Sequence, residues 1–166
     1  VGLSNFSLDL IYGTPGEDLE SWKTTLETAL ALQPPHISAY SLTIEPGTAL
    51  HRRMQAGEIE ATNLDDQADK YLLTENLLSQ NGMNWYEISN WSKPGHESQH
   101  NLNYWTNKNL WGYGPGAHSH LAGKRWWNVK HPSTYSSQLL NKETAVAGSE
   151  ELNSSQRKLG DVMLKM

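Results

Sequence analysis

The hydrophobic pattern in the first part of the chain switches from strand-like to helix-like and back. Residues 7–12 (SLDLIY) form a short, nearly continuous apolar run, which predicts a strand buried on both faces. From Leu19 to Leu30 the apolar residues recur at helical spacing, and the prolines that follow end this helix. Residues 36–44 (HISAYSLTI) then predict a second buried strand. Strand, helix and strand in this order predict a βαβ unit with parallel strands and a right-handed crossover.

The next segment continues the alternation of helix and strand. A turn at residues 45–48 (EPGT) precedes a predicted short helix over 49–56. A longer helix is predicted over 64–80, and the Asn-Gly pair that follows is a typical helix stop. Its apolar stripe consists of Leu64, Ala68, Tyr71, Leu72 and Leu78. Residues 84–89 (NWYEIS) predict a third strand, so the first half of the chain is α/β.

The second half, from Asn90 onward, is rich in Gly, His, Trp and Asn and has few long periodic segments. Residues 112–120 (GYGPGAHSH) contain too much glycine for a helix. A strand is predicted over 124–129 and a short helix, begun by a proline, over 131–140. The last segment, 152–166, predicts a helix with a serine N-cap and an apolar stripe. That stripe consists of Leu159, Val162, Met163 and Met166.

Length and composition limit the classes of protein to which the chain can belong. The 166 residues suffice for one domain with a hydrophobic core. The chain neither begins with Met nor carries a charged-then-apolar leader, so we expect it to be a piece of a longer chain. No apolar run approaches the roughly 18 residues that span a bilayer, so we expect no membrane span and a cytoplasmic location. The 13 basic and 18 acidic residues give a net charge of −5, which leaves no basic face for nucleic acid.

Cysteine usage removes several kinds of site. The chain contains no cysteine, which excludes a disulfide scaffold, a thiolate nucleophile and a Cys-held iron–sulfur cluster within these residues.

The aromatic residues comprise seven Trp and seven Tyr but only one Phe. Tyr and Trp combine an apolar body with a polar tip, as the walls of ligand pockets require, although many such residues belong to a core.

Two acidic residues accompany the predicted strands. Asp9 lies within an apolar strand, where an ionised carboxylate is costly unless it is paired or hydrogen-bonded. It could accept hydrogen bonds from a ribose or an amino group of a ligand, or it could hold a neighbouring loop in place. Glu45 follows the second strand and is a weak candidate at the rim of the sheet. No glycine-rich phosphate loop occurs in the chain.

Four of the histidines in the second half lie within residues 96–120: His96, His100, His118 and His120. The two histidines of the HSH triplet share one side of an extended chain, a spacing that metal sites use. Single histidines in polar loops are more often simply hydrogen-bonded, so a zinc site and a structural role both remain open.

The segment HNLNYW, residues 100–105, combines polar and aromatic side chains. If it forms a helical turn, His100 and Tyr104 share one face, and Asn101 and Trp105 share the adjacent face. The spacing alone is compatible with a ligand site and with a polar turn anchored by a buried tryptophan. We expect the face of His100 and Tyr104 to lie outside the core.

Several motifs together resemble one family. They occur in the same order along the whole chain as in the second half of the catalytic domain of the radical SAM proteins related to coproporphyrinogen dehydrogenase. The motifs are DLIYGTPGED (9–18), HISAYSLTIEPGT (36–48), YEISNWSKPGHESQHNLNYW (86–105) and GPGAHS (114–119). The resemblance implies an α/β fold, the latter half of an incomplete TIM-like β/α barrel. Its βα units would occupy 1–90, a Gly/His/Trp-rich extension 91–150, and the start of a small helical C-terminal domain 151–166.

Within this superfamily, HNLNYW is similar to the H-N-x-x-Y pattern of the heme chaperones. That resemblance implies a protein that binds heme and transfers it to an acceptor protein. It also implies heme contacts by His100, Asn101 and Tyr104, with His100 as the candidate iron ligand, since imidazole and phenolate both ligate heme iron. Two alternatives stay open: an oxygen-independent coproporphyrinogen III oxidase, and a structural or metal-binding module without catalysis.

The same resemblance assigns S-adenosylmethionine contacts to Asp9 and to the backbone near Thr43. The family's cluster-binding cysteines are absent here, so a 4Fe-4S cluster is implied only for a longer parent protein. Thr14 also replaces the leucine that the family more usually has. Part of a barrel exposes strand edges, so self-association through those edges is expected.

Overall fold

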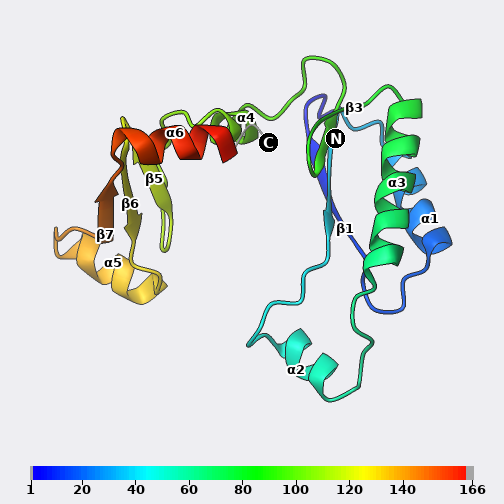
Figure 1. The fold of residues 1–166 in the computed structure, drawn as a ribbon, viewed down its shortest axis with the longest axis horizontal. Coiled ribbons are helices and arrows are strands. Elements are labelled where there is room, and N and C mark those ends of the chain that lie inside the picture. The colour runs from blue at the N-terminus through cyan, green and yellow to red at the C-terminus, as the bar shows by residue number, and fades with distance from the viewer. Residues whose placement is uncertain (1, 164–166) are drawn as a thin grey trace. The chain divides into compact units, whose positions relative to one another are not determined.

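The computed structural model describes residues 2–163 of the chain. They form two compact units, and the boundary falls between Glu97 and Ser98. The first unit contains a four-stranded sheet and the second a three-stranded sheet, each accompanied by helices (Figure 1). The mixed α/β class predicted from the sequence is therefore confirmed.

The first unit begins with the predicted strand, helix and strand. They are β1 (Ser7–Tyr12), α1 (Leu19–Ala31) and β2 (His36–Ser41). The carboxylate of Asp18 caps α1 by accepting a hydrogen bond from the backbone N–H of Ser21, at 2.8 Å. The two strands pair in parallel along their whole length, which confirms the predicted parallel pairing.

The predicted second strand is too long. It ends at Ser41 rather than at residue 44, because its partner β1 has already turned at Gly13. The last bond between the two segments joins the N–H of Leu42 to the carbonyl of Tyr12, at 2.8 Å. The short helix that follows, α2 (Ala49–Gln55), agrees with the prediction.

The predicted third strand, 84–89, is wrong in extent. The segment contains two strands, β3 (Asn84–Glu87) and β4 (Asn90–Ser92), which pair antiparallel with a bulge. β4 inserts between β3 and β2, so the sheet order is β1-β2-β4-β3 and the sheet is mixed. The physical reason is Trp91, which has no exposed surface and lies opposite Ile37 of β2, so its burial draws β4 into the sheet.

The core of the first unit lies between one face of this sheet and two helices. Figure 1 shows α1 and α3 (Leu64–Gln80) side by side, and the two helices pack against each other. The core residues are Tyr12, Trp22, Leu26, Ala29, Ile37, Ala39, Leu78, Met83 and Trp91. β1 was predicted to be buried on both faces, but Asp9 and Ile11 are exposed. Within the described residues, helices cover only one side of this strand, so the prediction is wrong for its other face.

The apolar stripe predicted for α3 is only partly correct. Leu78 is fully buried and Tyr71 packs against the core, but Leu64 and Leu72 are 78% and 59% exposed. The buried row instead contains Lys70 and Thr74, each with no exposed surface. Polar partners inside the unit satisfy these two side chains, which hydrophobic periodicity cannot foresee.

The second unit contains three helices and three strands. Its helices are α4 (Gln99–Trp105), α5 (Pro132–Leu140) and α6 (Ser154–Met163). Its strands are β5 (His118–Leu121), β6 (Lys124–Asn128) and β7 (Val146–Glu151), antiparallel in the order β5-β6-β7. The predictions of α5 and β6 are confirmed, and the glycine-rich segment before β5 is not helical.

Two features of the second unit differ from expectation. β7 was not predicted, because its sequence VAGSEE has few residues typical of strands. The cap of α6 is Asn153 rather than a serine: its side chain and that of Gln156 each accept the other's backbone N–H, both at 2.9 Å. The end of the predicted helix, residues 164–166 with Met166, lies outside the described residues. Among the helices described here, none has the length and apolar character needed to cross a bilayer.

Candidate functional site

Helix α4 carries the HNLNYW segment and forms for a local reason. Ser98 precedes the helix, and its hydroxyl accepts a hydrogen bond from the backbone N–H of Asn101, at 3.3 Å. The rings of His100 and Tyr104 meet edge-on with centroids 5.1 Å apart, so both side chains lie on one face. Both are exposed, and Tyr104 is 51% exposed, which confirms the predicted position of this face outside the core. Asn101 is half-buried.

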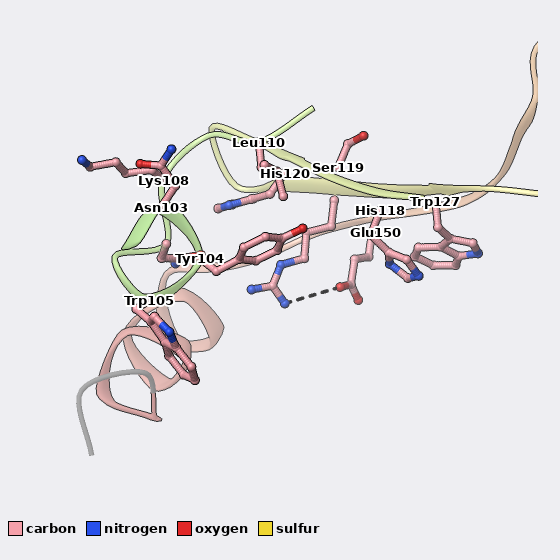
Figure 2. Close-up of a pocket in the computed structure, with 12 residues that line it drawn as sticks. Asn103, Tyr104, Trp105, Lys108, Leu110, His118, Ser119, His120, Trp127 and Glu150 are labelled. Carbon is pink, nitrogen blue, oxygen red and sulfur yellow. Dashed lines mark ion pairs between the residues drawn. The ribbon is translucent and has the colours of Figure 1, made fainter. Parts of the chain in front are cut away.

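A pocket of about 500 Å³ lies between α4 and one face of the three-stranded sheet (Figure 2). Its size falls within the range of small-molecule sites. Tyr104 lines it, whereas His100 and Asn101 are not among its lining residues. The lining residues are Asn103, Tyr104, Trp105, Asn107, Lys108, Leu110, His118, Ser119, His120, Arg125, Trp127 and Glu150.

The sheet wall of the pocket follows from strand alternation. His118 lies opposite Trp127, and His120 lies opposite Arg125, which in turn lies opposite Glu150. Residues directly opposite in antiparallel strands point to the same side, so these five side chains share one face. The two histidines of this face were candidates from the sequence. Arg125 and Trp127 were not, because KRWWN shows no alternation of polar and apolar residues.

The polar groups of this wall are incompletely paired. The imidazole Nε2 of His120 is buried and has no hydrogen-bond partner. The guanidinium of Arg125 is 3.8 Å from the carboxylate of Glu150, the ion pair drawn as a dashed line in Figure 2. Such a separation exceeds that of a hydrogen-bonded ion pair. The wall can therefore offer the Arg125 cation and the exposed imidazole of His118 to a ligand.

A zinc site would need at least three suitable side chains close together. Among residues 2–163, no group of three or more His, Cys, Asp or Glu side chains is placed to hold a metal ion. His118 instead stacks on Trp127, with ring centroids 5.8 Å apart and planes 26° apart.

In the first unit, Asp9 and Thr43 are both exposed but occupy different places. Asp9 lies in the middle of β1 opposite Ser38, and its carboxylate accepts a 3.4 Å hydrogen bond from the hydroxyl of Ser7. Thr43 and the rim residue Glu45 follow the carboxyl end of β2 and are exposed. The register thus puts Asp9 on the face of the sheet that is turned away from α1 and α3.

That face also contains a hydrogen-bonded histidine that the sequence analysis did not identify. His36 is 6% exposed, and its Nδ1 lies 2.8 Å from the hydroxyl of Ser7 while its Nε2 lies 2.7 Å from the hydroxyl of Tyr86. Burial lowers the pKa of His36, and the nearby charge of Asp9 opposes this effect. No sequence signal distinguished His36 from an ordinary strand residue, because its partners come from β1 and β3.

Two further polar atoms lie on this face without partners. Ser92 lies opposite His36, and Asn90 lies opposite Ser38. The hydroxyl of Ser92 and the amide oxygen of Asn90 are buried and have no hydrogen-bond partner. Buried polar atoms are normally paired, so unpaired ones indicate a place where a ligand or water completes the bonding.

The turn after β1 is tied to α3. The N–H of Gly13 donates a 2.7 Å hydrogen bond to the carboxylate of Glu17, which lies 3.6 Å from the ammonium group of Lys70. The amide of Gln67 donates to the carbonyl of Leu42, at 3.1 Å, just beyond the end of β2. These bonds hold the carboxyl ends of β1 and β2 in place, where open α/β sheets bind ligands.

The chain is similar in sequence to several known proteins. No family model matches the chain. It is 46% identical over 165 residues to the heme chaperone HemW of Mycobacterium tuberculosis, which covers 99% of this chain and 42% of the relative. It is 40% identical over 129 residues to HemW of Bacillus subtilis, covering 78% and 34%, and 42% identical over 120 residues to HemW of Escherichia coli, covering 71% and 30%. The chain thus spans about two fifths or less of these relatives.

A solved structure resembles the chain in fold. It is the coproporphyrinogen III oxidase HemN of Escherichia coli, described as a radical SAM enzyme, with a TM-score of 0.80 and 21% sequence identity. The match covers 98% of this chain and 40% of that structure, and at this identity it establishes the fold alone. Fold and sequence similarity agree with each other over nearly the whole chain, which therefore belongs to the HemW family and represents part of a radical SAM fold.

Proposed function

We propose that the chain is the heme-binding part of a protein that carries heme and transfers it to an acceptor protein. The observation that carries this proposal is the exposed pair of His100 and Tyr104 on α4, beside a pocket of about 500 Å³. An imidazole and a phenolate are both axial ligands of heme iron, and exposed side chains on one helix face allow a large ring to approach. The relatives named heme chaperones support the same reading.

Titration of the chain with hemin, followed by the Soret absorption band, tests this function. We expect His100→Ala and Tyr104→Phe each to shift the band or weaken binding, because each removes a group that can contact heme. His131→Ala is the matched control, since it removes an exposed histidine that does not line the pocket. If neither α4 variant changes the spectrum of bound heme, the proposed contact is wrong.

Decarboxylation of coproporphyrinogen III is the competing function. It is supported by the similarity to HemN, which concerns the fold alone. Turnover of coproporphyrinogen III at a catalytic rate by the complete parent protein would favour the oxidase over the chaperone.

For the first unit, we propose contact with S-adenosylmethionine on the face of the sheet that carries Asp9. An exposed carboxylate can accept hydrogen bonds from ribose hydroxyls or an amino group. Thr43 lies beyond the carboxyl end of β2, where such ligands bind. The chain has no cysteine, so the thiolates of a 4Fe-4S cluster would come from outside these residues.

Calorimetric titration with S-adenosylmethionine tests this contact. We expect Asp9→Asn to weaken binding because the amide replaces an ionised acceptor by a neutral one. Asp69→Asn, on α3, is the matched control. Equal affinities of the unsubstituted chain and Asp9→Asn would exclude a direct contact.

A further inference from the structure

The pocket beside α4 has two walls, and only one of them belongs to the HNLNYW segment. On the helix wall Tyr104 lines the cavity, but His100 does not. The sheet wall supplies two histidines of its own, His118 and His120. A ligand inside this cavity would therefore meet a histidine of the sheet rather than the histidine of the helix.

Of these two histidines, His118 is the accessible one. It is exposed, whereas Nε2 of His120 is screened from solvent. His118 stacks on Trp127, so the indole supports the imidazole ring from one side. Figure 2 shows Tyr104 reaching from α4 toward the side of the pocket where His118 and Trp127 lie. Aromatic side chains such as Tyr104 and Trp127 can pack against a planar ring, while an imidazole can point a ring nitrogen at a bound metal.

The same wall carries a cation, Arg125, beside the carboxylate of Glu150. Arg125 lies on it, and its only ion pair among the described residues is the 3.8 Å contact with Glu150. A guanidinium binds carboxylates well because its planar fork matches their geometry. Heme is a planar ring that bears carboxylates and a metal with axial positions, so each wall group has a matching group on this ligand.

We propose that heme binds inside this pocket beside Tyr104 and Trp127, with the ring edge of His118 turned toward the iron as its ligand and Arg125 paired with a heme carboxylate. The inference rests on the proposed heme-binding function and adds the residues of the sheet wall to it. His100 then contacts heme at the mouth of the site, outside the cavity.

Two probes separate iron coordination from the other contacts: hemin, and protoporphyrin IX without metal. We expect His118→Ala to shift the Soret band of bound hemin and to weaken hemin binding about tenfold, while metal-free protoporphyrin binds within about twofold of the unsubstituted chain. We expect Arg125→Gln to weaken both probes about tenfold, because the carboxylate contact does not depend on iron. His131→Ala leaves both titrations unchanged.

The outcomes distinguish this inference from the proposed function. If His100→Ala changes the hemin spectrum but His118→Ala and Arg125→Gln do not, the pocket assignment is overturned and heme binding stands. If the unsubstituted chain binds no hemin, both are overturned. Circular dichroism checks folding, and His118→Gln replaces His118→Ala if the alanine variant does not fold.

Discussion

The imidazole Nε2 of His36 lies 2.7 Å from the hydroxyl of Tyr86, and together they connect β2 to β3 across the intervening β4. His36 is buried, and the hydroxyl of Ser7 lies 2.8 Å from its other nitrogen. The two hydroxyls can satisfy a neutral imidazole, one as donor and one as acceptor. Protonation would make both ring nitrogens donors in a partly desolvated place, which is why the folded chain holds the pKa of His36 below its usual value.

This arrangement predicts loss of stability in mild acid. The unfolded chain takes up a proton at His36 as the pH falls through about 6.5, whereas the folded chain takes it up only at lower pH. The unfolded state therefore binds more protons in this window, so stability declines as the pH falls. We expect His36→Gln to show a smaller decline in urea midpoint between about pH 7 and pH 5. His131→Gln is the control and retains the decline of the unsubstituted chain, and an equally steep decline in both variants would argue against His36.

Removal of the Lys70 ammonium is expected to destabilise the first unit. This group has no exposed surface, lies 2.6 Å from the carboxylate of Asp66 and donates to the carbonyl of Glu17, also at 2.6 Å. Because the Asp66 side chain is 40% exposed and can turn to water, we expect Lys70→Met to cost about 2–3 kcal/mol, below the full cost of breaking a buried pair. Urea unfolding followed by tryptophan fluorescence measures it.

The control for this prediction is Lys23→Met on α1. Its ion pairs with Glu20 and Glu27 span 3.7 and 3.9 Å at an exposed surface. We expect this variant to change stability by less than about 0.5 kcal/mol. Similar losses in the two variants would show that the buried contacts of Lys70 add nothing.

Removal of the Thr74 hydroxyl is also expected to destabilise the first unit. Its hydroxyl lies 2.9 Å from Nε1 of the fully buried Trp22 and donates to the carbonyl of Lys70 at 2.7 Å. Thr74→Val keeps the shape but removes the acceptor, and we expect a loss of about 1–2 kcal/mol in urea unfolding. Thr28→Val is the control: its hydroxyl also donates to the carbonyl four residues earlier, but it is exposed, so we expect a change within about 0.5 kcal/mol.

Gly148 is expected to be intolerant of a side chain because of the pocket wall. A Cβ at this position would lie 2.5 Å from Cζ2 of Trp127, so the indole would have to move. We expect Gly148→Ala to lower stability by about 1–3 kcal/mol and to alter tryptophan fluorescence. Gly160→Ala, whose Cβ meets no atom within 4 Å, is the control and is expected to be neutral or slightly stabilising. A neutral Gly148→Ala would contradict the close packing of Trp127 on β7.

Local sequence patterns were sufficient to predict most helices and strands and the shared face of His100 and Tyr104 on α4. The strand, helix and strand of residues 7–41 and the helices α2, α3 and α5 follow from hydrophobic periodicity with proline and glycine signals. The faces of α4 follow from helical geometry alone, since residues four apart lie one above the other. His100 and Tyr104 were therefore paired correctly, while their role toward heme stays a prediction.

Contacts between segments that are distant in the sequence could not be predicted from such patterns. β4 inserts beside β2 because Trp91 is buried against the core, and α3 buries Lys70 because Asp66 and Glu17 satisfy its charge. Neither outcome is visible in hydropathy, which describes a residue without its partners.

The sequence by itself determined most helices and the first strands, the family and the exposed face of α4, because these depend on local spacing and on motifs contiguous in the chain. Only the tertiary structure decided that β5, β6 and β7 bring His118, Arg125, Trp127 and Glu150 onto one face, opposite Tyr104. The physical reason is cross-strand register: a shift by one residue moves every side chain to the other face, and that register is set by contacts between segments far apart in sequence.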